Sequence, residues 1–212
     1  SILNRAFYGI RMLTTKDGKF TNGIFGFMNI LLGLLEEHKP DSVAVAFDVK
    51  HPTFRHEMYD EYKGTRKPAP AELIEQFPTL KELLTYIGIS VIEKPGYEAD
   101  DILGTLSAAR TAQGGTCFLA TGDRDALQLV DGVTELMFTR KGISETILFT
   151  PARVHEEYGF GPEQVTDWKG LMGDTSDNIP GIPGVGEKTA VKLLCEYGTL
   201  ENVLENGENI KG

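Results

Sequence analysis

Several features that define common protein classes are scarce in this sequence. Its 212 residues include two cysteines, Cys117 and Cys195, which are too few for a disulfide framework and too isolated for a zinc site. No stretch reaches the ~20 consecutive apolar residues that a membrane-spanning helix needs, and no secretory signal opens the chain. Basic residues are also in the minority, because 21 Lys and Arg face 31 Asp and Glu, for a formal net charge of −10. Taken alone, that charge argues against a nucleic-acid partner.

The rest of the composition is typical of a folded globular domain. The chain is 41% hydrophobic and 25% charged, so disorder is not expected. Its length suits one domain, or one domain and a fragment. Ser1 is not an initiator Met, and the first residues have the character of an element already under way, so we expect a fragment. Reduced cysteines and the missing signal predict a cytoplasmic protein without membrane contact.

Strand-like and helix-like segments alternate over the first 150 residues. The patterns predict helices over 21–37, 70–88 (with a kink at Pro78), 98–112 and 125–130, and strands over 42–48, 89–92, 116–121, 133–139 and 145–149. Beyond about residue 151 only helices are expected. The alternation predicts an α/β fold with a mostly parallel central sheet and helices on both faces. We therefore expect a catalytic domain over 1–155 and a helical subdomain over 156–212.

Carboxylates gather at the predicted ends of these elements. In an open α/β sheet the loops that leave the carboxyl ends of the strands converge on one crevice, so acids from separate strands can meet there. Single acids have simpler explanations, such as helix capping or a favourable place in a first helical turn. Four clusters at ends that converge are harder to explain in that way. The eight acids are Asp48, Glu98, Asp100, Asp101, Asp123, Asp125, Asp174 and Asp177.

Eight carboxylates cannot lie together without cations, because their mutual repulsion would raise their pKa values until they became neutral. Oxygen ligands without nearby His or Cys favour Mg²⁺ or Mn²⁺ over zinc. Two such ions, about 4 Å apart, suit the attack of water on a phosphodiester. On a continuing helix, Asp174 and Asp177 would lie on one face, three residues apart.

Two further segments have the composition of nucleic-acid contacts. Residues 50–68 carry five Lys and Arg against three acids, interleaved with Tyr59 and Tyr62, so cations could follow phosphates while rings stack on bases. An ordinary solvated face is the alternative. Residues 181–190 combine closely spaced glycines with the start of a helix, which is typical of a helix-hairpin-helix that binds a phosphate backbone through N–H groups.

The chain resembles the 5′-nuclease domain of bacterial DNA polymerase I, within the flap-endonuclease superfamily. Six motifs occur in the family's order across nearly the whole chain. They are Phe47-Asp48 with 52–57, Tyr62-Lys63-Gly64-x-Arg66, Gly96-Tyr97-Glu98-Ala99-Asp100-Asp101, Thr121-Gly122-Asp123-Arg124-Asp125, 173–181, and the hairpin over 184–190. The resemblance implies a PIN-like 5′-nuclease fold with a helical arch near 50–75, followed by a truncated helix-hairpin-helix subdomain.

The resemblance also implies roles for individual residues. The eight acids would bind two or more Mg²⁺ or Mn²⁺ ions, Lys63 and Arg66 would act on the scissile phosphate, and K⁺ would bind at the hairpin. A further acid, on a family strand that precedes Ser1, is missing here, so we expect impaired activity of the fragment. The residues matched to DNA contacts are Arg5, Arg55, Tyr62, Lys67, Gly184, Gly186, Lys188 and Thr189.

The sequence thus predicts a metal-dependent 5′-3′ exonuclease and flap endonuclease that acts in replication and repair. Its expected partner is DNA with a 5′ flap, a nick or gap, or an RNA–DNA primer junction, and we expect a monomer without an obligate protein partner. Three alternatives stay open: a DNA-binding module whose catalysis has lapsed, a stand-alone flap endonuclease, and a PIN-like ribonuclease, which gives no reason for the hairpin.

Overall fold

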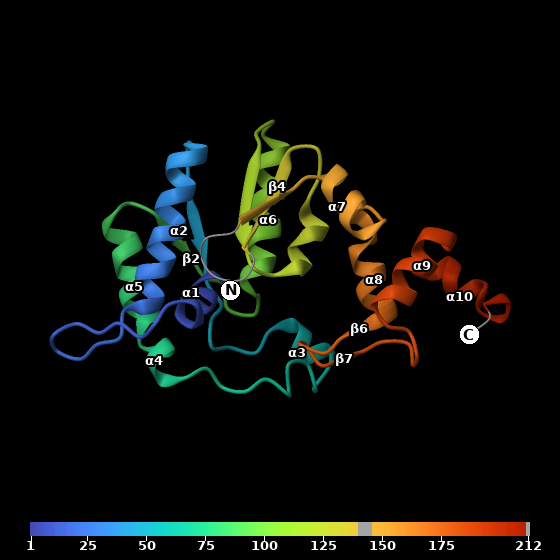
Figure 1. Ribbon diagram of the computed structural model, residues 1–212, viewed down its shortest axis with the longest axis horizontal. Helices are drawn as coiled ribbons and strands as arrows, with labels where there is room; N and C mark the ends of the chain where they lie inside the picture. Colours follow the sequence, from blue (N-terminus) through green and yellow to red (C-terminus); the bar gives the residue numbers. More distant parts are fainter. Residues whose placement is uncertain (140–145, 211–212) are drawn as a thin grey trace.

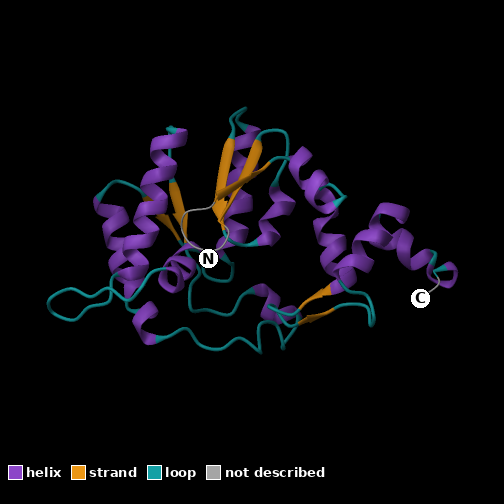
Figure 2. Cartoon of the chain, in the orientation of Figure 1, coloured by secondary structure: helices purple, strands orange, loops and turns teal. Residues whose placement is uncertain are grey.

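The strands before residue 150 form two sheets in the computed structural model, which describes residues 1–139 and 146–210. Strands β1 (Ala44–Ala46) and β2 (Ser90–Ile92) pair in parallel, with Val45 opposite Val91. Strand β3 (Cys117–Thr121) is parallel to β4 (Thr134–Thr139), and β4 is antiparallel to β5 (Thr146–Phe149). The α/β class is confirmed, but in the described part of the chain the expected single sheet is divided in two (Figure 2). The first residue of the strand predicted over 145–149 lies outside the described residues.

The first core lies between the two-stranded sheet and the N-terminal helices. It is built by α1 (Ile2–Gly9), α2 (Asn22–His38), α4 (Ala71–Ile74) and α5 (Gln76–Tyr86), with buried side chains such as Leu3, Phe27 and Leu80. The helix predicted over 70–88 is interrupted at Glu75 rather than kinked at Pro78. Pro78 lies in the first turn of α5, where its missing N–H has no helical partner to lose.

The second core joins the mixed sheet to the C-terminal helices. It includes Leu119 and Leu136 from the sheet together with Trp168 and Leu194 from later helices. The helices in this part of the chain are α6 (Ala99–Ala112), the 3₁₀ helix η1 (Arg124–Leu129), α7 (Pro151–Tyr158), η2 (Pro162–Gln164), α8 (Val165–Met172), α9 (Glu187–Tyr197), α10 (Leu200–Glu205) and η3 (Gly207–Asn209). The boundary predicted between residues 155 and 156 falls inside α7, and the core is continuous across it.

The sequence pattern predicts only helices in the C-terminal part, but that part also contains strands. A short antiparallel ribbon, β6 (Gly173–Asp174) and β7 (Ile179–Pro180), lies between α8 and α9. Gly181 allows this ribbon to close, because a Cβ there would collide with the backbone of Met172 and Gly173. Among the described residues, no helix is both long and apolar enough to cross a membrane.

The basic segment over 50–68 contains one short helix, α3 (Phe54–Met58). Thr53 caps it, and the backbone N–H of Thr53 donates to Nδ1 of His56 at 3.1 Å. Within the expected arch, near 50–75, only α3 and α4 are helical, and the chain between them runs in turns and extended backbone. In Figure 1 this segment runs along the lower side of the molecule, from β1 to the β6–β7 ribbon.

Candidate active site

The end of β1 meets the start of α6. Asp48 follows β1 by two residues, and its Oδ1 accepts a hydrogen bond of 2.7 Å from the N–H of Ala99, the first residue of α6. Glu98 is the N-cap of that helix, and Asp100 lies in its first turn. Acids that are fifty residues apart in sequence therefore lie at one helix N-terminus, where the helix dipole favours negative charge.

Asp123 and Asp125 approach this group from the end of β3. Asp123 caps η1, since its Oδ1 accepts a hydrogen bond of 3.1 Å from the N–H of Asp125. Burial, together with the charges of Asp123, Asp48 and Asp125, raises the pKa of Asp100 to about 6. The four carboxylates therefore lie within range of one another's charge.

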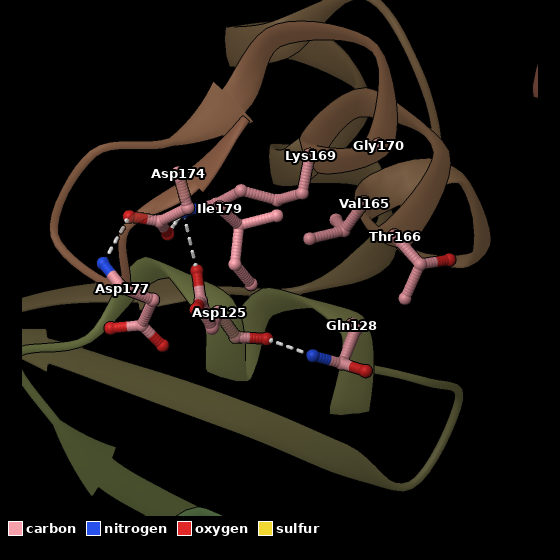
Figure 3. A pocket seen from close by; sticks show the side chains of 9 residues that line it. All are labelled: Asp125, Gln128, Val165, Thr166, Lys169, Gly170, Asp174, Asp177 and Ile179. Carbon is pink, nitrogen blue, oxygen red and sulfur yellow. Dashed lines mark hydrogen bonds and ion pairs between the residues drawn. The ribbon is translucent and has the colours of Figure 1, made fainter. Parts of the chain in front are cut away.

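Asp174 and Asp177 lie on the opposite side of the site, in the turn that connects β6 to β7. A continuing helix would place both acids on one face, but α8 already ends at Met172. Asp174 Oδ1 instead accepts hydrogen bonds from the N–H groups of Ser176 and Asp177, at 2.7 and 3.2 Å. Both acids line a cavity of about 290 Å³ that also contains Asp125 and Lys169 (Figure 3).

Lys169 connects the two acid groups. Its Nζ lies 2.7 Å from Asp125 Oδ1 and 2.5 Å from Asp174 Oδ2. Burial alone would raise the pKa of Asp174, but hydrogen bonds from Lys169 and Ser176 lower it to about 2. The pKa of Asp125 stays above its usual value because burial outweighs the same ammonium.

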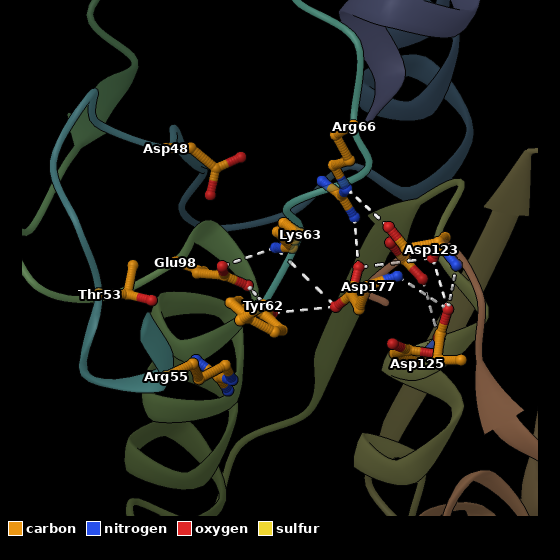
Figure 4. Close-up of polar contacts among 12 residues, drawn as sticks. Asp48, Thr53, Arg55, Tyr62, Lys63, Arg66, Glu98, Asp123, Asp125 and Asp177 are labelled. Atoms are coloured by element: carbon orange, nitrogen blue, oxygen red, sulfur yellow. Dashed lines mark hydrogen bonds and ion pairs between the residues drawn. The ribbon is translucent and has the colours of Figure 1, made fainter. Parts of the chain in front are cut away.

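Three side chains of the basic segment enter the space between Glu98 and Asp177 (Figure 4). Lys63 Nζ contacts Glu98 at 2.6 Å, and Arg66 Nη2 contacts Asp177 at 2.5 Å. The Tyr62 hydroxyl donates to Asp177 at 2.9 Å and lies 3.1 Å from Glu98. The Tyr62 ring is 5% exposed, so in this arrangement it is not free to stack on a base.

Asp101 is occupied by contacts within the protein. Its two oxygens accept a bidentate pair of 2.8 Å hydrogen bonds from Arg55, and Oδ2 also accepts the N–H of Glu98 at 2.9 Å. The Arg55 guanidinium holds the pKa of Asp101 below its usual value. Arg55, which the resemblance matches to a DNA contact, is thus paired with an acid in this structure.

Of the remaining residues matched to DNA contacts, Arg5 lies next to the acid group and the others are exposed. Arg5 donates to the carbonyl of Gly122, beside Asp123, and its guanidinium lies 5.3 Å from the Phe138 ring centroid. Lys67 is exposed on the basic segment. The four hairpin residues matched to DNA contacts are exposed at or just before the N-terminus of α9: Gly184, Gly186, Lys188 and Thr189. Gly184 has a φ of 83°.

The donor set suits a hard divalent cation. Asp125 Oδ1 is buried without a hydrogen-bond partner of normal geometry, and Asp100 is crowded by other acids. Within residues 1–139 and 146–210, however, no three His, Cys, Asp or Glu side chains are grouped closely enough to hold an ion. Lys63, Arg66 and Lys169 occupy carboxylate oxygens instead.

Sequence reasoning missed two contributors to the site. Lys169 gave no signal, because a lysine in the last turn of a helix is explained by the helix dipole alone. Asn178 lies in the motif over 173–181, but its structural role was not predicted. Its side-chain amide donates to the carbonyl of Glu61 at 2.8 Å and ties the basic segment to the β6–β7 turn.

Solved structures share this fold and define its class. The T5 D15 flap endonuclease in complex with DNA and metal ions matches 89% of this chain and 71% of its own, with a TM-score of 0.73 and 22% identity. The catalytic core of Rad2 with DNA substrate matches 98% of this chain and 62% of its own, with a TM-score of 0.57 and 20% identity. At these identities the likeness establishes a 5′-nuclease type of fold.

Two family models then cover the whole chain. The N-terminal resolvase-like domain of 5′-3′ exonucleases matches residues 1–159, and their C-terminal SAM fold matches residues 160–212. The chain belongs to the 5′-3′ exonuclease family. Among curated proteins, DNA polymerase I of Bacillus caldotenax is 49% identical and that of Bacillus subtilis is 47% identical, each over all 212 residues. The chain spans 24% of the length of either relative.

Proposed function

We propose that this chain is the 5′-nuclease part of a DNA polymerase I, and that it hydrolyses DNA phosphodiesters at 5′ ends and flaps. The observation that carries the proposal is that acids from three segments act on Asp100, while Lys63 pairs with Glu98 and Arg66 with Asp177. Family membership and the DNA polymerase I relatives support the same activity. A role in primer removal and nick repair follows from that assignment.

Divalent ions, Mg²⁺ or Mn²⁺, are the proposed cofactors. Asp48, Glu98, Asp100 and Asp123 are the proposed ligands of one ion, and Asp125, Asp174 and Asp177 those of a second. Because no three such side chains are grouped closely enough in the described part of the chain, they would have to turn toward the ions on binding. Such ions lower the pKa of bound water and stabilise the leaving oxygen. Because both oxygens of Asp101 are already hydrogen-bonded, we assign it a positioning role: it orients the backbone of Glu98 and holds Arg55.

The basic segment supplies the proposed phosphate contacts. Lys63 and Arg66 would exchange their carboxylate partners for the scissile phosphate, where they stabilise negative charge that develops during hydrolysis. The same movement would release the Tyr62 ring for stacking on a base. Arg5, Arg55 and Lys67 lie around this path, and the exposed hairpin would bind the duplex backbone, with K⁺ at its carbonyls.

A metal titration with a fluorescent 5′-flap substrate tests the proposal in the full-length protein that contains this chain. Cleavage should require Mg²⁺ or Mn²⁺ and fall by at least about a hundredfold in Asp123→Asn, in keeping with loss of a charge-stabilising group. Asp41→Asn, an exposed acid outside the site, is the matched control and should keep full activity. Undiminished cleavage by Asp123→Asn would contradict the proposed site.

Substrate arms of the same assay separate the alternatives. A DNA flap, a nicked duplex and an RNA–DNA junction should all be cut, whereas a preference for RNA flaps would indicate a PIN-like ribonuclease. Binding without turnover would indicate a module whose catalysis has lapsed. We further propose a monomer in the cytoplasm, in keeping with the bacterial polymerase relatives.

A further inference from the structure

Lys169 is a partly buried cation that the proposed reaction does not use. It lies in the last turn of α8, with a side chain that is 25% exposed, and its Nζ is within 2.7 Å of carboxylate oxygens from two different segments. One of these, Asp125, follows β3, and the other, Asp174, begins the β6–β7 turn. The ammonium therefore bridges the catalytic α/β part of the chain and the hairpin part.

The oxygens that Lys169 holds are the ones a metal ion would need. Asp174 Oδ1 is saturated by the N–H of Ser176, the hydroxyl of Ser176 and the N–H of Asp177, so only Oδ2 is left for a cation. Asp125 Oδ1 is buried, and in the described chain its compensation is the charge of Lys169. An ion that binds Asp174 therefore has to take Oδ2 from the ammonium, and at Asp125 it would meet the same ammonium 2.7 Å from Oδ1.

The charge balance gives the ammonium a second effect. Without Lys169, burial and the charges of Asp123 and Asp174 would act on Asp125 with no nearby compensation. Unpaired buried carboxylates destabilise a fold, whereas a divalent ion would neutralise them more completely than one ammonium does. Lys169 thus stabilises the metal-free fold but weakens the binding of an ion at the same carboxylates.

We propose that Lys169 is the resident counter-ion of the Asp125–Asp174 pair: it holds the two parts of the chain together without metal, and competes with the second divalent ion. The inference rests on the metal sites proposed above. It assigns Lys169 a positioning role that sets the affinity of the second ion and keeps this site weaker than the one around Asp100.

The test compares Mn²⁺ binding and thermal stability of the metal-stripped full-length protein with those of Lys169→Met. Calorimetry should show about tenfold tighter binding of the weaker Mn²⁺ ion in the variant, because one nearby positive charge is removed. The metal-free variant should melt at a lower temperature than the wild type, and saturating Mn²⁺ should remove that difference. Lys169→Arg, which keeps the charge, should retain the weak affinity.

Lys81→Met is the matched control, because Lys81 also pairs with a carboxylate, that of Glu93, away from the acid groups. It should leave Mn²⁺ binding unchanged. If Lys169→Met does not fold without metal, Lys169→Gln purified in Mn²⁺ takes its place, since its amide can still hydrogen-bond. Unchanged or weaker Mn²⁺ binding in the variant would overturn the inference, as would a stability loss that Mn²⁺ does not recover. A wild-type protein that binds no Mn²⁺ would overturn both the metal sites and this inference.

Discussion

At the scale of single residues, Asp100 makes ion binding depend on pH. Burial and the neighbouring acid Asp123 raise its pKa from 3.8 to about 6. A metal ion binds the ionised carboxylate, so below that pKa it has to displace a proton, and its affinity falls as pH falls. For one displaced proton we expect Mn²⁺ affinity to drop about tenfold between about pH 7.5 and about pH 5, as measured by calorimetry.

The proton also affects the metal-free fold. Because the folded-state pKa of Asp100 lies above its unfolded value, its charge destabilises the fold above about pH 6, and protonation relieves that cost as pH falls. Asp100→Asn removes the titrating group and should flatten this part of the pH dependence. A variant that keeps the wild-type slope would show that another group is responsible.

At the scale of the elements, the β6–β7 ribbon places Asp174 and Asp177, and its closure depends on Gly181. A methyl group there would collide with the backbone of Met172 and Gly173, which cannot move aside as a flexible side chain could. Gly181→Ala should lower the free energy of unfolding by about 1–3 kcal/mol, the usual cost of overpacking. Denaturant unfolding followed through Trp168, the chain's one tryptophan, measures the change.

Gly207→Ala is the control for that substitution, because a Cβ at Gly207 meets no atom within 4 Å. Its effect should stay within about 0.5 kcal/mol, as for other surface changes. Equal stability of the two variants would mean that the ribbon can move away from the end of α8 at little cost.

Longer elements could be predicted from the sequence because a buried face leaves a periodic signal. The strand predicted over 116–121 is found over Cys117–Thr121, and the helix predicted over 98–112 over Ala99–Ala112. The ribbon could not be predicted, since two-residue strands have no period, and its turn depends on the Asp174 side chain accepting the N–H of Ser176. The division of the strands into two sheets depends on pairing, which composition does not encode.

The site was predictable to the same degree. Acids at strand ends are visible in the sequence, and the structure brings Asp48, Asp100, Asp123 and Asp125 within reach of one another's charge. The partners of those acids were not visible. Nothing in the spacing of Lys63, Arg66 or Lys169 indicates which carboxylate each will contact, because those contacts join segments about 35 to 111 residues apart, or cross a turn.

At the scale of the whole molecule, the two family regions share one core. The family models divide the chain between residues 159 and 160, yet Leu194 of α9 is 1% exposed in the same buried cluster as Leu119 of β3 and Leu136 of β4. Domains with separate cores unfold independently, whereas residues that share a core lose protection together. The hairpin part of the chain therefore shares its core with the strand that precedes Asp123 and Asp125.

Leu194→Ala tests this coupling by native-state hydrogen exchange. The substitution opens a cavity in the shared core and should cost about 2–5 kcal/mol. Amides of β3 and β4, on the other side of the family boundary, should lose protection together with those of α8 and α9, while α2 and α5, which belong to the first core, lose less. Leu204→Ala, at a leucine that is 62% exposed on α10, should change little. Loss of protection confined to residues after 160 would mean that the subdomain opens alone, and that DNA bound at the hairpin could not be positioned rigidly over the acids.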